Sequence, residues 1–320
     1  MTALTQSAEM QRRKFLSQLG ILSAAAGLAV SSRELAAGDA DGAGPPLPAI
    51  KLGSLSVSRL VAGWNPIGGH SYLGAHTDRH MKEYFSVEQT MQFLLDCEKA
   101  GINVHQFSYV ESTPEVLRRV REQGSQMQFF ALHAGRDGIA QVVRDTQPFA
   151  LAHHGGVTDQ LFREGKSQEV RDYVKAVKDA GLLAGVSAHN PDCIRQIADE
   201  GWEVDFFMCC FYYLTRPHGA GDHAAPVPET LQIAYPFYRS DPQTMTRVMR
   251  EVSQPCLGFK ILGAGRMCAS SEMVREAFQF AFQNIKPIDG VIVGMYPRFE
   301  DEISINARHT RELCESQAGA

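Results

Sequence analysis

Short hydrophobic runs alternate with amphipathic segments from about residue 52 onward. Eight of the runs have the length and the β-branched or aromatic content of buried strands. They are residues 59–63, 102–107, 127–133, 149–153, 183–187, 204–210, 256–262 and 290–294. The segments between them repeat apolar residues at helical spacing, as in SVEQTMQFLLDCEKAG, where Val87, Met91 and Leu94 share one face. The pattern predicts eight strand–helix units.

Strands joined by helical crossovers form a parallel sheet, and eight such units are typical of a closed (β/α)8 TIM barrel. An open doubly wound sheet is the structural alternative. Such a sheet usually has a glycine-rich phosphate turn after its first strand. Here the first strand is followed by AGWNPIGGHSYLG, which lacks that spacing. We therefore predict a single barrel domain over residues 45–320.

Residues 1–44 have a different character. Residues 11–16 read QRRKFL and precede the mildly apolar run GILSAAAGLAV. Paired arginines before a weakly hydrophobic segment resemble a twin-arginine export signal. The run is too short and too rich in alanine and glycine for a stable membrane span. We expect a signal peptide and linker at 1–44, recognition by the twin-arginine export machinery, and a periplasmic or other extracytoplasmic location.

Composition limits the partners further. The chain has 320 residues, is 44% hydrophobic and carries a formal net charge of -5, which argues against nucleic acid as a partner. The seven cysteines are odd in number and form no CxxC pair, so they are not a disulfide framework. Cys209 and Cys210 lie in an apolar run and are expected to be buried small residues.

Several segments resemble aldo/keto reductases. KLGSLSVSRLVAGWNPIGG is similar to that family's opening hairpin and first strand, and CEKAGINVHQFS to its second strand. GVSAHNPDCIRQIADEGWEVDFF resembles the fifth strand, and VIVGMYPRFEDEISINARH the last strand and the helix that holds a cofactor phosphate. The resemblance spans nearly the whole of residues 45–320 in the right order. It implies an aldo/keto reductase-like barrel and an NAD(P) cofactor.

The same resemblance implies where a catalytic Asp, Tyr, Lys and His would lie. In that order the positions fall on Gln106, Glu111 with Tyr109 two residues before it, His133, and His153 or its neighbour His154. Only the histidine is retained. A tyrosine without its lysine and aspartate has little reason to exchange a proton at neutral pH, because its pKa is near 10. Carbonyl reduction by the family's usual mechanism is therefore not expected.

The implied cofactor contacts are better preserved. They fall on Ser187, Tyr212, Gly294, Arg298, Glu302 and Asn306. Gly294 and Arg298 keep the spacing of a helix start that binds phosphate, where backbone N–H groups and an arginine suit an anion. Glu302 and Asn306 are explained equally well as a solvated helix face.

The C-terminal strand ends, where barrel enzymes have their active sites, carry further polar residues. In chain order these are Asn65, Gln106, His133, His153 with His154, His189, Tyr212 and Lys260. Imidazoles at three consecutive strand ends favour proton transfer or metal binding. His105 should face away from the barrel interior, opposite to Gln106. Lys260 follows an apolar strand, where a cation is unfavourable unless it is paired or used, and we expect it to hold an anion rather than form a Schiff base.

Three functions agree with these residues. The first is an exported NAD(P)-dependent oxidoreductase acting on a small sugar- or polyol-like molecule, with His133 and His153 as proton relay and Gln106, Tyr109 and Lys260 beside them. The second is a redox-neutral hydrolase, lyase or isomerase whose histidines surround a divalent metal. The third is a non-catalytic binding protein on the same scaffold. A catalytic site built on His133 and His153 requires their rings to lie inside the barrel, within reach of one ligand.

Overall fold

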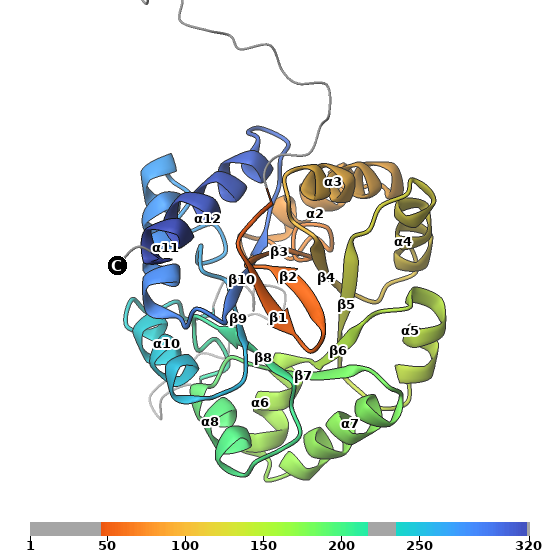
Figure 1. Ribbon diagram of the computed structural model, residues 1–320, viewed down its shortest axis with the longest axis vertical. Coiled ribbons are helices and arrows are strands. Elements are labelled where there is room, and N and C mark those ends of the chain that lie inside the picture. The colour runs from red at the N-terminus through yellow and green to blue at the C-terminus, as the bar shows by residue number, and fades with distance from the viewer. Residues whose placement is uncertain (1–45, 217–234, 319–320) are drawn as a thin grey trace, which may run out of the picture. The chain divides into compact units, whose positions relative to one another are not determined.

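Eight parallel strands close into a barrel, and helices surround it (Figure 1). The computed structural model describes residues 46–216 and 235–318, which belong to one compact unit, Ala43–Ala320. Around the barrel the strand order is β10, β3, β4, β5, β6, β7, β8, β9, and neighbouring strands are parallel. The molecule is a (β/α)8 TIM barrel, as the hydrophobic pattern predicts.

The barrel strands are β3 (Leu60–Gly63), β4 (Val104–Ser108), β5 (Gln128–His133), β6 (Ala150–His153), β7 (Leu183–Ala188), β8 (Phe206–Cys210), β9 (Cys256–Phe259) and β10 (Gly290–Gly294). The helices are α2 (Ala75–Tyr84), α3 (Val87–Lys99), α4 (Thr113–Glu122), α5 (Ile139–Thr146), α6 (Gly155–Arg163), α7 (Ser167–Asp179), α8 (Pro191–Asp199), α10 (Asp241–Glu251), α11 (Ser271–Asn284) and α12 (Glu302–Ala318).

All eight predicted strands are present, with ends that differ by at most three residues. The largest difference is in β9, which was expected to continue to residue 262 and ends at Phe259. The next residue, Lys260, has a φ of 59°, and a left-handed backbone cannot continue a strand. β4 starts two residues late because the Ile102 N–H donates to the Cys97 carbonyl and completes the end of α3.

A hairpin covers the N-terminal end of the barrel. Its strands, β1 (Ala49–Leu52) and β2 (Leu55–Ser58), are antiparallel, and in Figure 1 they lie across the barrel. Ile50, Leu52 and Val57 are buried in the same apolar cluster as the inward-facing residues of the barrel strands. The hairpin therefore closes this end and leaves the opposite end for a site.

Each barrel strand contributes to two apolar layers, because successive side chains point to opposite faces. The inner cluster contains Val104 and Phe130, whereas Phe107 and Phe129 belong to the layer between barrel and helices. His105 lies in this outer layer, where its Nδ1 is 2.9 Å from the Ala62 carbonyl oxygen. The prediction that His105 faces away from the interior is confirmed.

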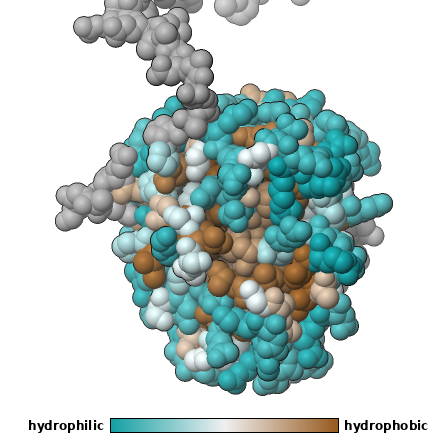
Figure 2. All heavy atoms as spheres, turned by 45° about the vertical axis from the view of Figure 1, so that its right-hand side comes forward, coloured by the Kyte–Doolittle hydropathy of each residue, from teal (hydrophilic) through white to brown (hydrophobic). Residues whose placement is uncertain are grey.

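Two further features of the molecule are its buried cysteines and its mainly hydrophilic surface. Cys209 and Cys210 are free and buried in the outer layer, as predicted. In Figure 2 hydrophilic side chains predominate on the face shown, and hydrophobic ones gather towards its centre. Among the described helices, none has the length and hydropathy to cross a membrane.

Candidate active site

A cavity of about 550 Å³ opens at the C-terminal ends of the barrel strands, a size typical of small-molecule sites. Inward-facing side chains from five strands line it: Gln106, Leu132, Ser187, Met208 and Ile292. The same cavity continues between the loop after β9 and the start of α12. Gln106, Ser187 and Gly294 are thus where the sequence places them.

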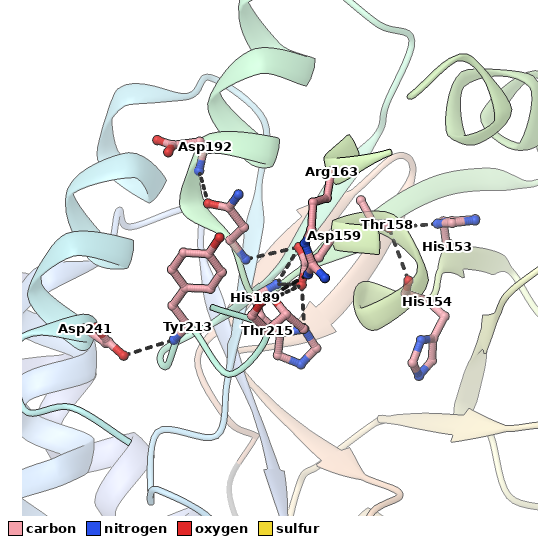
Figure 3. A network of polar contacts seen from close by, with 11 residues as sticks. His153, His154, Thr158, Asp159, Arg163, His189, Asp192, Tyr213, Thr215 and Asp241 are labelled. Carbon is pink, nitrogen blue, oxygen red and sulfur yellow. Dashed lines mark hydrogen bonds and ion pairs between the residues drawn. The ribbon is translucent and has the colours of Figure 1, made fainter. Parts of the chain in front are cut away.

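A histidine of the cavity wall is held by a buried aspartate behind it (Figure 3). His189 follows β7 and lines the cavity, and its Nδ1 lies 2.9 Å from Oδ2 of Asp159 on α6. The Asp159 side chain is 1% exposed. Its oxygens also accept the backbone N–H groups of His189 and Asn190, and the Thr215 hydroxyl at 2.8 Å. A buried carboxylate with this many donors is well stabilised.

This pair sets the protonation of His189. An ionised carboxylate only accepts hydrogen bonds, so Nδ1 of His189 carries the proton and Nε2 of the neutral ring is an acceptor. Burial lowers the pKa of His189, and the bond to Asp159 partly opposes that shift. The ring is therefore neutral near pH 7 and oriented by Asp159, as a general base requires.

Lys260 brings a positive charge to the same cavity. Its Nζ lies 4.6 Å from the ring centre of Tyr72 and 4.8 Å from that of Phe259. It is the one lysine or arginine among the described lining residues, and none of the ion pairs between described side chains includes it. Burial opposes the charged form, but Tyr72 and Cys210 outweigh it and raise the pKa of Lys260. A lysine that stays cationic suits an anion better than Schiff-base chemistry.

Backbone strain is concentrated at this mouth. In the described part of the chain, four residues other than glycine have a positive φ: Tyr72, Gln147, Lys260 and Ala264. Three of them line the cavity, and Gln147 caps the end of α5. Such conformations are unfavourable and persist where surrounding structure holds them, often at functional sites.

Two further polar groups face the cavity. His154 precedes α6 and is an exposed residue of the cavity lining. Burial lowers the pKa of His154 to about 4, and repulsion from the protonated form of His189 and from Lys260 adds to this shift. The Ser187 hydroxyl is buried and has no hydrogen-bond partner among the described residues. An unsatisfied buried hydroxyl at a cavity is a place where a ligand can bind.

His133 and His153 lie elsewhere. Both end their strands as predicted, but their rings pack against Tyr173 of α7, at centre-to-centre distances of 6.3 Å and 4.8 Å. A hydrogen bond of 2.7 Å joins His153 Nδ1 to the Thr158 hydroxyl on α6. The expectation that the two rings lie inside the barrel is wrong. Neither is among the residues that line the cavity.

Strand alternation explains this result. Leu132 and Ala152 belong with the inner cluster, so the residue that follows each of them points outward. The inward position at the end of β6 is taken one residue later, by His154. The two histidines fill the layer between barrel and helices, as His105 does.

Three other predicted residues also lie outside the cavity lining. The Tyr109 hydroxyl donates to Asp145 on α5, at 2.7 Å. Tyr212 is buried beside Phe237, with ring centres 4.9 Å apart. Arg298 stacks over the exposed Phe299 and lines a separate surface hollow between α3 and α12.

Glu302 and Asn306 do line the far end of the cavity, together with Glu300. The Tyr296 backbone N–H donates to Glu302 at 2.6 Å, so this carboxylate also orders the loop before α12. Among the side chains of residues 46–216 and 235–314, no three His, Cys, Asp or Glu are grouped to hold a metal ion. Residues 217–234, in the connection between β8 and α10, lie outside the described residues.

Sequence reasoning missed Asp159 and Tyr72. Asp159 stands at the same helical spacing as the buried Gly155 and Thr158, and a carboxylate on the buried face of a helix is a signal that could have identified it. Tyr72 belongs to the irregular segment after β3, which shows no periodic pattern. Nothing in the sequence pairs it with Lys260.

Comparison with known proteins supports the fold. No family model and no curated protein matches the chain. A solved aldo-keto reductase from Bacillus halodurans, in its holo form, is similar with 10% identity and a TM-score of 0.52, covering 84% of this chain and 96% of its own. A glycerol dehydrogenase from Gluconobacter oxydans is similar with 12% identity and a TM-score of 0.53, covering 84% and 94%. At such identities the likeness extends to an aldo-keto reductase-like barrel and not to an activity.

Proposed function

We propose that this protein is an enzyme that transfers a hydride between a small sugar- or polyol-like substrate and a nicotinamide cofactor. The proposal is carried by one observation: His189, which Asp159 holds from behind, and Lys260 line a single cavity, which continues to the start of α12. A hydroxyl group that gives up a hydride must also lose a proton, so the reaction needs a base at the mouth. His189 is a suitable base.

The residues present fit a nicotinamide dinucleotide. The partnerless Ser187 hydroxyl would bind the carboxamide of the nicotinamide, at a position where the aldo/keto reductase resemblance also expects a serine. Asn306 and the start of α11 line the other end and would hold ribose and phosphate through amide and backbone N–H groups. Bound there, the cofactor supplies or accepts the hydride.

The far end of the cavity favours NAD over NADP. Glu300 and Glu302 line it, whereas Arg298 turns away towards Phe299. A carboxylate suits a ribose 2′-hydroxyl and repels a 2′-phosphate, which an arginine would accommodate. We therefore propose NAD as the cofactor.

Each polar group of the mouth then has a task. In the oxidation direction His189 Nε2 accepts the proton of the substrate hydroxyl. Asp159 holds the ring through Nδ1 and stabilises the imidazolium that forms. Both His189 and Lys260 lie beside the Phe259 ring, at 5.7 Å and 4.8 Å from its centre, so the lysine charge favours a negative group near the reacting carbon.

NADH formation from NAD and a panel of polyols, aldoses and hydroxy acids tests the proposal on the full chain. His189→Gln and Asp159→Asn should lower kcat by about 10²- to 10⁴-fold, the usual contribution of a positioned base. Tyr109→Phe, at the outer surface, should keep wild-type kcat, and thermal unfolding reports whether each variant is folded. Wild-type activity in His189→Gln, or no NAD-dependent turnover of any compound in the panel, would contradict the proposal.

A redox-neutral acid–base reaction is the second candidate. The charge of the cavity favours it. NAD carries two negative phosphates, whereas the described lining has one cationic side chain, Lys260, to neutralise them. His189 would then remove a proton next to a carbonyl, with Lys260 stabilising the negative charge. Deuterium uptake by a keto substrate in heavy water, without NAD, would identify this reaction. A non-catalytic binding protein would show neither activity.

We also propose that the protein is exported by the twin-arginine route. Support comes from the QRRKFL sequence of residues 11–16 and the apolar run after it, both outside the described residues. This route carries folded proteins, so a cofactor bound before export agrees with it.

A further inference from the structure

The surroundings of Lys260 identify the chemistry of the substrate. The ammonium group lies against the rings of Tyr72 and Phe259, and Tyr235 also lines this part of the cavity. The Tyr72 side chain also forms a hydrogen bond with Lys260, but a phenol and aromatic faces give the cation no acceptor of carboxylate strength. A cation held this way has strong unused capacity to bind an anion.

We propose that the substrate carries one carboxylate, which binds Lys260, and a hydroxyl a short distance away, which faces His189: a polyhydroxy acid of the aldonate type. This inference rests on the proposed function, because it takes the cavity as the substrate site.

The residues that line the cavity indicate how many negative charges the substrate carries. Lys260 is the one cation among the described lining residues, whereas Glu300 and Glu302 line the far end. A single carboxylate at the Lys260 end is neutralised and lies away from these acids. A dianion such as a phosphate ester would leave one of its two charges without a cationic partner at the Lys260 end.

The position of the hydroxyl follows from the shared neighbour Phe259. The His189 ring centre is 5.7 Å and the Lys260 Nζ is 4.8 Å from the centre of this ring. The lysine and histidine groups are therefore no more than about 10 Å apart, a span that one polyhydroxy chain can bridge with its carboxylate on the lysine and a hydroxyl on the histidine. Gln106 and His154 line the same region and can hydrogen-bond further hydroxyls of the chain.

Binding can be measured without turnover through tryptophan fluorescence. The chain has two tryptophans; Trp64 lines the cavity, whereas Trp202 packs against Phe162 in the outer layer. In a Trp202→Phe background the full chain reports occupancy of the cavity through Trp64 alone. The probes are D-gluconate and D-glucitol, which share a six-carbon polyhydroxy skeleton and differ at the carboxylate.

Gluconate should bind about 10- to 100-fold more tightly than glucitol, as expected for one charge-assisted hydrogen-bonded pair. Lys260→Met should abolish this preference and leave glucitol binding unchanged, whereas Lys260→Arg should retain most of it. Lys51→Met, an exposed lysine of the hairpin, is the matched control and should behave as wild type.

Equal affinities of the wild type for gluconate and glucitol would overturn the proposal, and this comparison needs no variant that might fail to fold. A Lys260→Met protein that loses NAD affinity but keeps the gluconate preference would also overturn it, because the lysine would then serve the cofactor. Tight gluconate binding without NADH formation would leave the carboxylate site standing and contradict only hydride transfer.

Discussion

At the scale of single residues, the site contains two kinds of buried polar group: those with hydrogen-bond partners in the protein, and those without. Asp159 is buried and accepts from His189, Asn190 and Thr215, so its charge is satisfied within the protein. Ser187, on the same wall, has no partner in the described part of the chain. The first arrangement fixes a base, and the second leaves a hydroxyl for a ligand.

Gly155 makes room for both groups. A Cβ atom at this position would lie 2.8 Å from the Ser187 hydroxyl oxygen and 3.2 Å from Cε1 of His189, so the side chains would have to move. Gly155→Ala should therefore lower kcat/KM at least about tenfold, since small displacements at a reacting centre are costly, while helix propensity limits any loss of stability.

Gly156→Ala is the control for this substitution. Its Cβ would meet only the His154 ring, at 3.4 Å, an ordinary contact. Activity and thermal unfolding of the two variants, measured side by side, separate a local effect from a general one. Equal activities would show that Gly155 is not needed for its closeness to Ser187 and His189.

At the scale of elements, the sequence predicts where the strands lie. It predicts only in part which side chains of a strand point into the barrel. The hydrophobic runs locate all eight barrel strands, and Gln106, Ser187 and Lys260 line the cavity as expected. His133 and His153 were assigned to the wrong face. A strand of a closed barrel is apolar on both sides, so the sequence shows no alternation of polarity from which to read the direction of a terminal histidine.

The outward-facing histidines make the fold sensitive to acid. Burial lowers the pKa of His105 and of His153 to about 4. Unfolded histidine has a pKa near 6.5, so the unfolded chain takes up these protons first, and stability is complete above about pH 6.5 and declines as the pH falls towards 4. Each histidine should contribute a loss of at most about 3 kcal/mol, which urea unfolding at a series of pH values measures.

His105→Phe isolates one of these contributions. A phenyl ring fits between Phe107 and Phe129 but removes the hydrogen bond to the Ala62 carbonyl oxygen, at a cost of about 1 kcal/mol near neutral pH. The variant should lose less stability than the wild type between about pH 6.5 and pH 4.5. His76→Gln, on the exposed side of α2, should follow the wild type. Parallel curves for His105→Phe and the wild type would refute the assignment.

At the scale of the whole barrel, closure brings together residues that the sequence keeps far apart. Tyr72 follows the first barrel strand and Lys260 follows the seventh, yet the lysine lies over the tyrosine ring. Asp159 and His189 come from consecutive strand–helix units and are thirty positions apart. Such pairs depend on barrel closure and on irregular loops, which local periodicity does not report. The fold therefore follows from the sequence far more completely than the site.

The export signal is the one proposal that belongs to the chain as a whole and can be tested without any knowledge of the reaction. Replacing Arg12 and Arg13 together by Lys keeps the charge but removes the paired arginines of a twin-arginine signal. In a bacterial host the full-length precursor should then stay in the cytoplasm, whereas Arg33→Lys, beyond the apolar run, should be exported as the wild type is. Fractionation followed by immunoblotting measures the location of both variants.

A host that lacks the twin-arginine translocase should retain the wild type in the cytoplasm as well. Normal export of the double variant, or export in that host, would show that residues 1–44 use another route or have another role.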